Sequence, residues 1–306
     1  MGALHEGHLS LIRMAAAENH RVVVSVYVNP TQFGVHEDLD SYPKTWENDC
    51  GMLKDLDKEL AEDGNNLGGI AAVFAPTTDT MYPSGRPDQE ANGKGSFVTI
   101  TPVGEVLEGA SRPTFFRGVA TVCMKLFNIV MPEKVYFGQK DVQQTVVIKK
   151  MVKDFCMNTE VVVGDTQRAQ DGLALSSRNV YLGTRRRKVS TILSKILKVA
   201  ELGYLREHRL RDELLGPAEE LAKLLLMEQQ QLPSEERVNF EIDYISLADP
   251  ETMQELDEVD ETKGAIISGA VKMLPVECPQ PGEDLGLSDG PPVRLIDNII
   301  LKPVKL

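Results

Sequence analysis

The stretch HLSLIRMAAAENHRVVVSVYVNPTQF, residues 8–33, decides the fold class of this chain. Its first half has helical periodicity, because Leu9, Ile12 and Ala16 recur three to four positions apart. The run RVVVSVYV (21–28) follows and is rich in β-branched residues, as in a strand that is covered on both faces. A helix that leads directly into a buried strand is typical of an α/β fold.

The same alternation continues along the chain. Helical periodicity predicts further helices at about 42–60, 121–132 and 143–155. Short apolar runs between them predict strands at 71–76, 134–141 and 159–166. Strands that alternate with helices indicate a Rossmann-like, doubly wound parallel sheet, and in such sheets ligands bind beyond the carboxyl ends of the strands.

The pattern changes after residue 166. One long helical stretch is predicted at 185–231, and short strands are predicted near 239–249 and 264–274. We therefore expect a Rossmann-like domain over 1–166 and a smaller α+β lid domain over 167–306. Two segments, AEDGNNLGG (61–69) and ECPQPGEDLGLSDGPP (277–292), are rich in Gly, Pro and acidic residues and are expected to be flexible, solvated loops.

Composition excludes several classes of function. The 306 residues carry a formal net charge of −13, so extended binding to nucleic acid is not expected despite the basic run RRRK at 185–188. The four cysteines are scattered without a C-x-x-C pair, which disfavours disulfides and zinc and fits a reducing compartment. No apolar run is long enough to span a bilayer and no signal peptide is visible, so a cytoplasmic protein without a membrane partner is expected.

The motif HEGH at residues 5–8 is the first candidate for chemistry. At helical spacing His5 and His8 share a face, and a helix N-terminus favours phosphate. Gly7 lets a flat ligand approach the backbone, and two imidazoles suit the charge that builds on a phosphate during displacement. The plainer interpretation is a pair of surface histidines that cap a helix. A zinc site is less favoured because a third ligand is not evident.

Polar side chains also follow the predicted strands. Asn29 and Gln32 come directly after the first strand, where their amides could bind a hydroxyl or a carboxylate without adding charge. In FGQKDVQQ (137–144), Lys140 could reach a phosphate and Asp141 could accept from ribose hydroxyls. Each stretch alone could equally be a polar turn.

Two later stretches add cationic donors. In DGLALSSRN (171–179), Ser176, Ser177 and Arg178 form a mobile, donor-rich loop in which Arg178 could bind phosphate bidentately. LEGASRPTFFRG (107–118) adds Arg112. Neither a Walker loop nor a G-x-G-x-x-G motif occurs, so the combined pattern favours nucleotidyl transfer through the His-x-Gly-His route.

Six ordered motifs resemble the pantothenate synthetase (pantoate–β-alanine ligase) family of His-x-Gly-His nucleotidylyltransferases: MGALHEGH, VNPTQF, LEGASRP…FRGV, FGQKDVQQ, DGLALSSRN and RLIDN. They cover nearly the whole chain. The resemblance implies an AMP-forming ligase that makes a C–N bond. Pantoate attacks the α-phosphorus of ATP to give pantoyl adenylate and pyrophosphate, and β-alanine then displaces AMP to give pantothenate. It also implies Mg²⁺ bound through the ATP phosphates, no metal-ligating residues in the chain, and a homodimer.

The resemblance also implies residue roles, carried over motif by motif. The expected catalytic residues are His5, His8, Lys140 and Arg178. The expected ATP-binding residues are Met1, Gly2, Gly7, Gly138, Lys140, Asp141, Gln167, Leu175, Ser176, Ser177 and Arg178. Pantoate and β-alanine are expected at Gln32, Gln144, Asn29 and Arg112.

The chain departs from the family pattern in two places. The family has a strand ending in Pro-Thr before the position of Met1, so the first, central strand of the sheet is expected to be missing. Thr114 and Phe115 stand where Gly-His is expected. Two alternatives stay open: another His-x-Gly-His nucleotidylyltransferase that acts on a phosphorylated acceptor, which the neutral Gln32 and Gln144 disfavour, and an inactive nucleotide-binding protein crippled by the missing strand.

Overall fold

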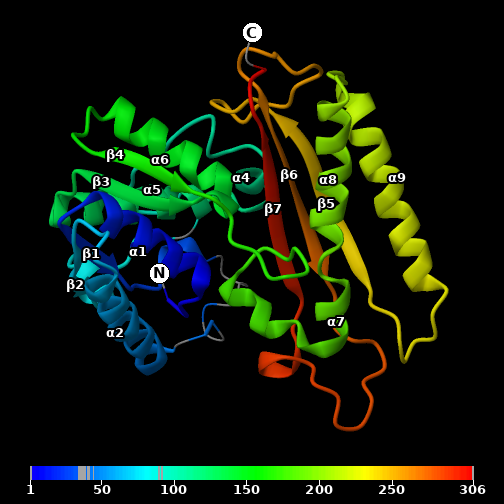
Figure 1. Cartoon of the computed structure of the whole chain (residues 1–306), viewed down its shortest axis with the longest axis horizontal. Helices are drawn as coiled ribbons and strands as arrows, with labels where there is room; N and C mark the ends of the chain where they lie inside the picture. Colours follow the sequence, from blue (N-terminus) through cyan, green and yellow to red (C-terminus); the bar gives the residue numbers. More distant parts are fainter. Residues whose placement is uncertain are drawn as a thin grey trace. The chain divides into compact units, whose positions relative to one another are not determined.

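The computed structural model describes residues 2–33, 39, 42–43, 45–88, 90 and 92–304. The chain divides into two compact units, Met1–Gln167 and Arg168–Leu306, each with its own sheets and helices (Figure 1). The division falls one residue after the boundary expected from the sequence. We refer to them as the first and the second unit.

The strands of the first unit are all parallel. β1 (Arg21–Ser25) pairs with β2 (Gly69–Phe74), and β3 (Lys134–Gly138) pairs with β4 (Glu160–Gly164). Among the described residues these are two separate two-stranded sheets, whereas the sequence predicted one sheet. Helix α1 (Glu6–Glu18) contacts all four strands and so links the two pairs (Figure 1).

The remaining helices of the first unit lie close to their predicted ranges. They are η1 (Pro30–Gln32), α2 (Trp46–Asp63), α3 (Thr78–Met81), α4 (Glu108–Ser111), α5 (Phe115–Val130), η2 (Gln139–Asp141) and α6 (Val142–Asp154). Helix α5 begins six residues before its predicted start. Its first turns pack against η1, and the apolar spacing of the helix already begins there, with Phe116, Val119 and Ala120 buried.

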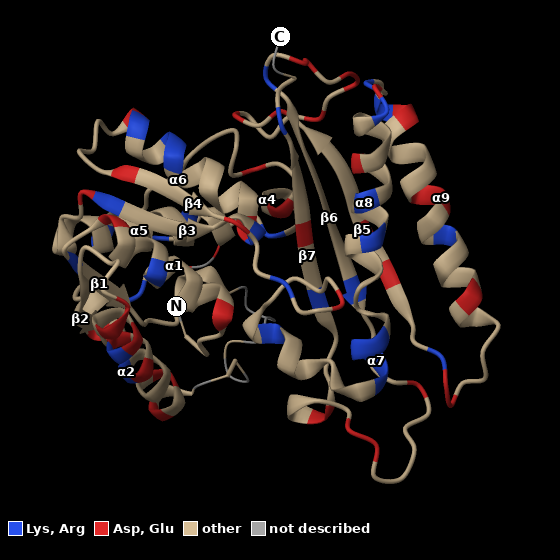
Figure 2. Ribbon diagram, in the orientation of Figure 1, with Lys and Arg blue, Asp and Glu red and all other residues tan. Residues whose placement is uncertain are grey.

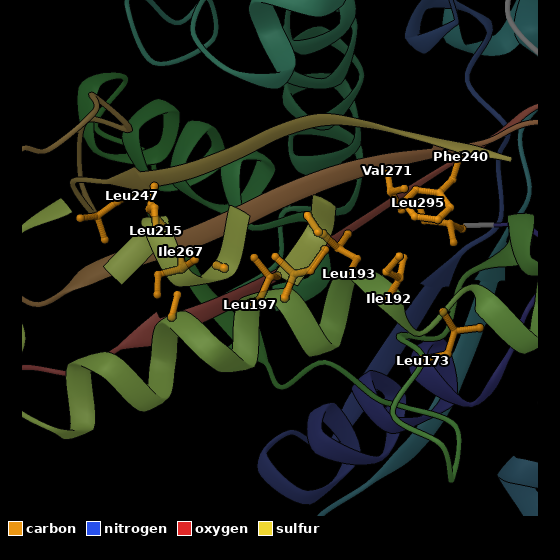
Figure 3. Close-up of a cluster of buried hydrophobic side chains, with 14 of the residues drawn as sticks. Leu173, Ile192, Leu193, Leu197, Leu215, Phe240, Leu247, Ile267, Val271 and Leu295 are labelled. Carbon is orange, nitrogen blue, oxygen red and sulfur yellow. The ribbon is translucent and has the colours of Figure 1, made fainter. Parts of the chain in front are cut away.

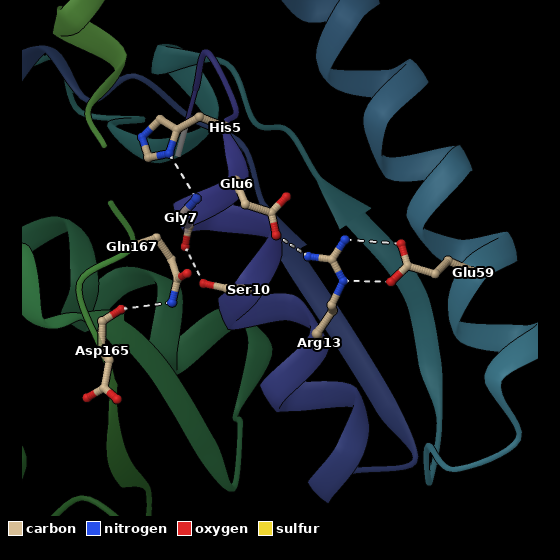
Figure 4. Close-up of polar contacts among 8 residues, drawn as sticks. All are labelled: His5, Glu6, Gly7, Ser10, Arg13, Glu59, Asp165 and Gln167. Carbon is tan, nitrogen blue, oxygen red and sulfur yellow. Dashed lines mark hydrogen bonds and ion pairs between the residues drawn. The ribbon is translucent and has the colours of Figure 1, made fainter. Parts of the chain in front are cut away.

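Helix α1 anchors the core of the first unit. Its buried face, Leu9, Ile12, Ala15 and Ala16, packs with β1 and with the leucines of α2. On its outer side Arg13 bonds to Glu6 of the same helix and bidentately to Glu59 of α2 (Figure 4). Burial of the apolar face contributes about 25 cal/mol per Å² of area removed from water, so packing rather than these exposed ion pairs holds α1 in place.

The second unit is an antiparallel sheet covered by helices. β5 (Phe240–Ala248), β6 (Ala265–Met273) and β7 (Val293–Leu301) lie in that order, and β7 was not predicted as a strand. The predicted helix over 185–231 is wrong as one element: it is α7 (Gly183–Val189), α8 (Ile192–Leu205) and α9 (Arg211–Gln230). Leu193 and Leu197 of α8 pack onto Ile267 of β6 in one apolar cluster (Figure 3).

The breaks between these helices have a packing cause. Helices α8 and α9 contact each other, and they pack on the sheet through β6, β7 and β5. A single straight helix of the predicted length could not fold back to bury both apolar faces. The turn between them carries Glu207 at a positive φ of 70°, a conformation that ends a helix.

Candidate active site

The two motif histidines cap helix α1 reciprocally. The Gly7 backbone N–H donates to His5 Nδ1 at 3.1 Å, and the His5 backbone N–H donates to His8 Nδ1 at 3.3 Å. This is a capping box built from imidazoles in place of the usual hydroxyl and carboxylate. The ring centroids lie 4.1 Å apart. Both side chains therefore sit together at the N-terminus of the helix (Figure 4 shows His5).

Buried Asp49 of α2 fixes the segment that precedes this cap. Its Oδ1 accepts from the Leu4 backbone N–H at 2.9 Å and from the Thr45 hydroxyl at 2.8 Å. The sequence reasoning missed Asp49, because the spacing of α2 residues shows only that it lies on the covered face of that helix. The motif is thus held from both sides, by its own cap and by α2.

Both histidines are neutral at physiological pH. The pKa of His5 is lowered to about 4, mainly by burial and also by the charge of Lys140, while Asp141 opposes the shift. Burial also lowers the pKa of His8 to about 3, with His5 and Lys140 contributing in the same direction. Because Nδ1 of each ring accepts a backbone N–H, the single proton of each neutral imidazole lies on Nε2.

Lys140 and Asp141 reach this helix terminus from the end of β3. The strand passes through Gly138 into η2, and the Lys140 Nζ lies 3.8 Å from Asp141 Oδ1. Strand β3, which leads into η2, contacts α1, and the charges of Lys140 and Asp141 both act on the pKa of His5. A cation therefore comes from the strand next to α1, whose N-terminus carries the two histidines, and both features favour an anion such as phosphate.

The small and flanking residues predicted to bind ATP lie at the same end of the first unit. Gly2 is buried, and Gly7 lies in the first turn of α1. Gln167 lies beside Gly7, and its side-chain amide donates to the Asp165 carbonyl at 3.4 Å (Figure 4). Met1 lies outside the described residues.

Asn29 is held inside the turn that carries Gln32. Its Nδ2 donates to Thr31 Oγ1 at 2.9 Å and to the Gly118 carbonyl at 3.4 Å, while the Tyr82 hydroxyl donates to its Oδ1 at 2.8 Å. A Cβ at position 118 would lie 2.0 Å from the Thr31 carbonyl, so only glycine lets α5 approach this turn. Asn29 is 3 % exposed and shapes the turn around Gln32.

Arg112 also acts on this turn. Its Nη2 donates to the Gln32 carbonyl at 3.0 Å and its Nη1 to Glu108 Oε1 at 3.2 Å. The guanidinium carbon lies 3.8 Å from the centre of the Phe115 ring, a cation–π contact. Phe115 belongs to the Thr114–Phe115 pair that departs from the family pattern, and here it provides the surface on which Arg112 stacks.

Gln143 ties this segment to α6. Its Oε1 accepts from the Glu108 backbone N–H at 3.1 Å, and its Nε2 donates to the carbonyls of Val103 and Val106 at 2.9 and 2.7 Å. Hydrogen bonds therefore connect α6 through Glu108 and Arg112 to Gln32. The sequence reasoning selected the neighbouring Gln144, which is half-buried in the first turn of α6, and missed Gln143.

The remaining predicted residues belong to the second unit. Ser177 and Arg178 open the short 3₁₀ helix η3 (Ser177–Tyr181), where a loop was predicted. Ser176 caps it, since its Oγ accepts the Arg178 backbone N–H at 3.3 Å. Leu175 precedes the cap and is half-buried.

Comparisons with known proteins agree on one family. The profile of the pantoate-beta-alanine ligase family matches residues 1–300. The pantoate–beta-alanine ligase of Saccharomyces cerevisiae is 41 % identical over 307 residues, which cover 98 % of this chain and 90 % of the relative. The pantothenate synthetase of Chloroflexus aggregans is 40 % identical, with 98 % and 91 % covered.

Solved structures of this kind are also similar. The pantothenate synthetase of Thermus thermophilus matches with a TM-score of 0.76 and 34 % identity, over 99 % of this chain and 91 % of that one. A Francisella tularensis pantoate-beta-alanine ligase, described as complexed with beta-gamma ATP and beta-alanine, matches with a TM-score of 0.65 and 31 % identity, over 98 % and 87 %.

Proposed function

This chain belongs to the pantoate–β-alanine ligase family, and from that premise we propose how its own residues carry out the reaction. It is a ligase of pantothenate biosynthesis that joins pantoate to β-alanine and uses ATP. The observation that carries the proposal is the pair of neutral, Nε2-protonated histidines at the start of α1, beside Lys140.

The proposed route has two displacements. A pantoate carboxylate oxygen attacks the α-phosphorus of ATP, the bond to the bridging oxygen breaks, and pyrophosphate leaves. The β-alanine amine then attacks the acyl carbon, loses a proton, and AMP leaves with the carboxylate oxygen. Adenylation is needed because the oxide of a free carboxylate is a poor leaving group.

His5 and His8 are proposed to stabilise the first displacement. Their backbone-bound Nδ1 atoms fix the rings, so each Nε2–H is left as a donor to phosphate oxygens. Because both rings are neutral, they donate hydrogen bonds without competing as cations for the substrate carboxylate. Lys140 is proposed to neutralise charge on the triphosphate, and Asp141 to accept from the ribose hydroxyls.

The other nucleotide contacts are assigned by position. Gly2, Gly7, Gly138 and Gln167 lie around the start of α1 and the end of β3 and are proposed to line the ATP site. We propose that Leu175, Ser176, Ser177 and Arg178 bind the triphosphate from the second unit, with donors from the capped turn of η3. In this proposal 168–306 serves as a lid domain.

Gln32 and Gln144 are proposed to bind pantoate, with β-alanine nearby. Neutral amides can donate to the hydroxyl and carboxylate oxygens of a hydroxy acid without adding charge. Asn29 and Arg112 were expected to touch these substrates too. Their hydrogen bonds to the turn and to the Gln32 carbonyl support a role that acts through Gln32.

Mg²⁺ is proposed to enter with ATP. Within the described part of the chain no group of three or more His, Cys, Asp or Glu side chains could hold a metal ion. A magnesium ion on a triphosphate keeps several waters and needs few protein ligands, so this donor set fits ATP-borne Mg²⁺. When bound, the ion would supply neutralisation of phosphate charge.

The finer architecture proposed for the first unit is a single Rossmann-like sheet. Both strand pairs are parallel, and both share α1 as a covering helix. One further parallel strand between β1 and β3 would join the pairs.

A cytoplasmic homodimer is proposed from the family resemblance. Val23 of β1 and Val73 of β2 are each 40 % exposed, which is apolar surface that a second subunit could cover. The four cysteines are free, and none of the described helices combines the length and apolar character needed to cross a bilayer. Sedimentation equilibrium should give twice the chain mass of 33.8 kDa, and a single-chain mass would exclude the dimer.

One assay tests the proposed chemistry. Protein, ATP, Mg²⁺, pantoate and β-alanine should give AMP and pantothenate in equal amounts, whereas release of inorganic phosphate without AMP would exclude adenylation. His8→Ala should lower the adenylation rate by roughly 10²–10³, as for losing one donor to developing charge. Turnover close to wild type in this variant would refute the role of His8, and an inactive wild-type protein would favour a purely nucleotide-binding chain.

A further inference from the structure

Arg186 is a buried guanidinium whose five N–H groups are all bound to backbone carbonyls. Nε donates to Leu182 at 3.1 Å, Nη1 to Leu274 and Pro291 at 3.4 and 2.7 Å, and Nη2 to Tyr181 and to Leu285 at 3.2 Å. The residue is 1 % exposed. A guanidinium has five N–H donors, so none is left to bind a ligand. Arg186 can only act on a substrate through the segments that it holds.

Two of those segments are the end of η3 and the acidic insertion 277–292. Tyr181 and Leu182 close η3, while Leu285 and Pro291 belong to the insertion. The insertion was expected to be a flexible solvated loop, and the structure instead shows it bound to the start of α7. Moving any of these carbonyls away would leave a buried charged donor without a partner, which is costly, so the segments that carry them are held in this arrangement.

Neighbouring residues fasten the same insertion. Arg185 binds Glu283 bidentately, at 2.7 and 2.6 Å, and both side chains are little exposed. The Thr184 backbone N–H donates to the Asp284 carbonyl at 3.0 Å. Arg187 pairs with Asp171, so all three arginines of the run RRRK are engaged within the second unit and the run is not a free basic patch (Figure 2 shows its place in α7).

A glycine lets the insertion touch η3 directly. Gly286 has a φ of 93°, and a Cβ there would lie 2.4 Å from the Tyr181 carbonyl oxygen. That carbonyl is the one that also accepts from Arg186 Nη2. A side chain at position 286 would therefore push on η3 even with Arg186 intact.

We propose that Arg186 is a positioning residue for the nucleotide: it braces the insertion against η3 and so holds Ser177 and Arg178 in place. The inference rests on the proposed function, in which this turn binds the triphosphate. The turn is one short unit, since the Asn179 and Leu182 backbone N–H groups donate to Ser176 and Asn179 carbonyls at 3.0 and 3.2 Å. A shift at Tyr181 is therefore transmitted to Arg178 within one helical turn.

The test compares two variants that disturb the brace from opposite sides. Arg186→Lys keeps the charge but loses the five-donor fork, and Gly286→Ala keeps the fork but displaces Tyr181. Each should raise the KM for ATP by roughly 10- to 100-fold, as for a misplaced binding group, while the KM for pantoate changes less than about twofold. Glu277→Gln, which breaks an exposed ion pair with Arg237 in the same insertion, is the matched control and should leave both constants unchanged.

The outcomes separate this inference from the proposed function. An unchanged KM for ATP in both variants, or an equal rise in the KM for pantoate, overturns the role of Arg186. If Arg178→Ala also leaves the KM for ATP unchanged, the assignment of this turn to the triphosphate fails as well. If Arg186→Lys does not fold, the KM values of Gly286→Ala for ATP and pantoate are sufficient to test the role of Arg186. Faster hydrogen exchange at residues 177–182 in each variant is expected, and unchanged exchange would contradict the brace.

Discussion

Replacing His8 with Gln should weaken the pH dependence of stability without removing the cap of α1. Gln is a usual residue at this position of a capping box, because its amide oxygen can accept the backbone N–H of the capping residue as His8 Nδ1 now does. The change therefore removes one titrating group while it keeps the hydrogen bond. At pH 7.5 the free energy of unfolding should stay within about 1 kcal/mol of wild type.

The magnitude follows from the lowered pKa. Folding moves the pKa of His8 from 6.5 to about 3, so between these values the unfolded chain binds a proton that the folded chain does not. Stability is then greatest above pH 6.5 and falls as the pH drops, by at most about 1.4 kcal/mol per pH unit for each such histidine. Allowing for solvent access to the ring, His8 alone should cost the wild type about 1–2 kcal/mol between pH 7.5 and pH 5.

Urea unfolding at pH 7.5, 6.5, 5.5 and 5.0 measures this difference. Trp46, the single tryptophan, lies at the start of α2 and reports on the first unit by fluorescence. Between pH 7.5 and pH 5.0 the free energy of unfolding of the wild type should fall by about 1–2 kcal/mol relative to that of His8→Gln. If the free energy of unfolding varied with pH in the same way in the wild type and in His8→Gln, the conclusion that His8 is neutral in the folded protein would be refuted.

Three further substitutions test the substrate side of the site. Gln144→Ala should raise the KM for pantoate roughly tenfold and leave ATP affinity nearly unchanged, and equal losses would mean that pantoate binds elsewhere. Gln143→Leu removes the acceptor of the Glu108 N–H and the donor to the Val103 and Val106 carbonyls, of which Val106 keeps the Gly109 N–H. It should lower the free energy of unfolding by about 2–4 kcal/mol in urea titrations, and a loss below about 0.5 kcal/mol would contradict its structural role. Arg112→Lys keeps the charge but loses the fork and the stacking, so the KM for pantoate should rise several-fold through Gln32, and wild-type kinetics would count against that route.

Local patterns predicted most elements of the first unit. Apolar spacing found α1 and α6 nearly to their ends, and a β-branched run together with three short apolar runs found all four parallel strands. The prediction of one long helix over 185–231 was wrong because the apolar periodicity continues through the turns, where the chain must reverse to cover the sheet. Strand β7 was missed because its centre carries Asp297 and Asn298, polar residues that look unlike a buried strand.

The strand tolerates these residues because of a distant partner. Asp297 is 4 % exposed and accepts a bidentate pair from Arg168 at 2.6 and 2.8 Å, more than a hundred positions away. A buried carboxylate needs such a partner, and no local pattern shows where it will come from. The sequence did not point to Tyr82 and Gln143 for the same reason: they bond to Asn29 and Glu108, which lie on other elements.

Because α1 contacts all four strands, ligand binding at this helix is coupled to the stability of both strand pairs. Its N-terminus carries the histidine pair, and the helix contacts two sheets that, among residues the structure describes, do not pair with each other. A ligand bound at that N-terminus would raise the free energy of unfolding of both strand pairs at once. A nucleotide at a hundred times its dissociation constant contributes about 2.7 kcal/mol of such linkage, which α1 transmits to both strand pairs.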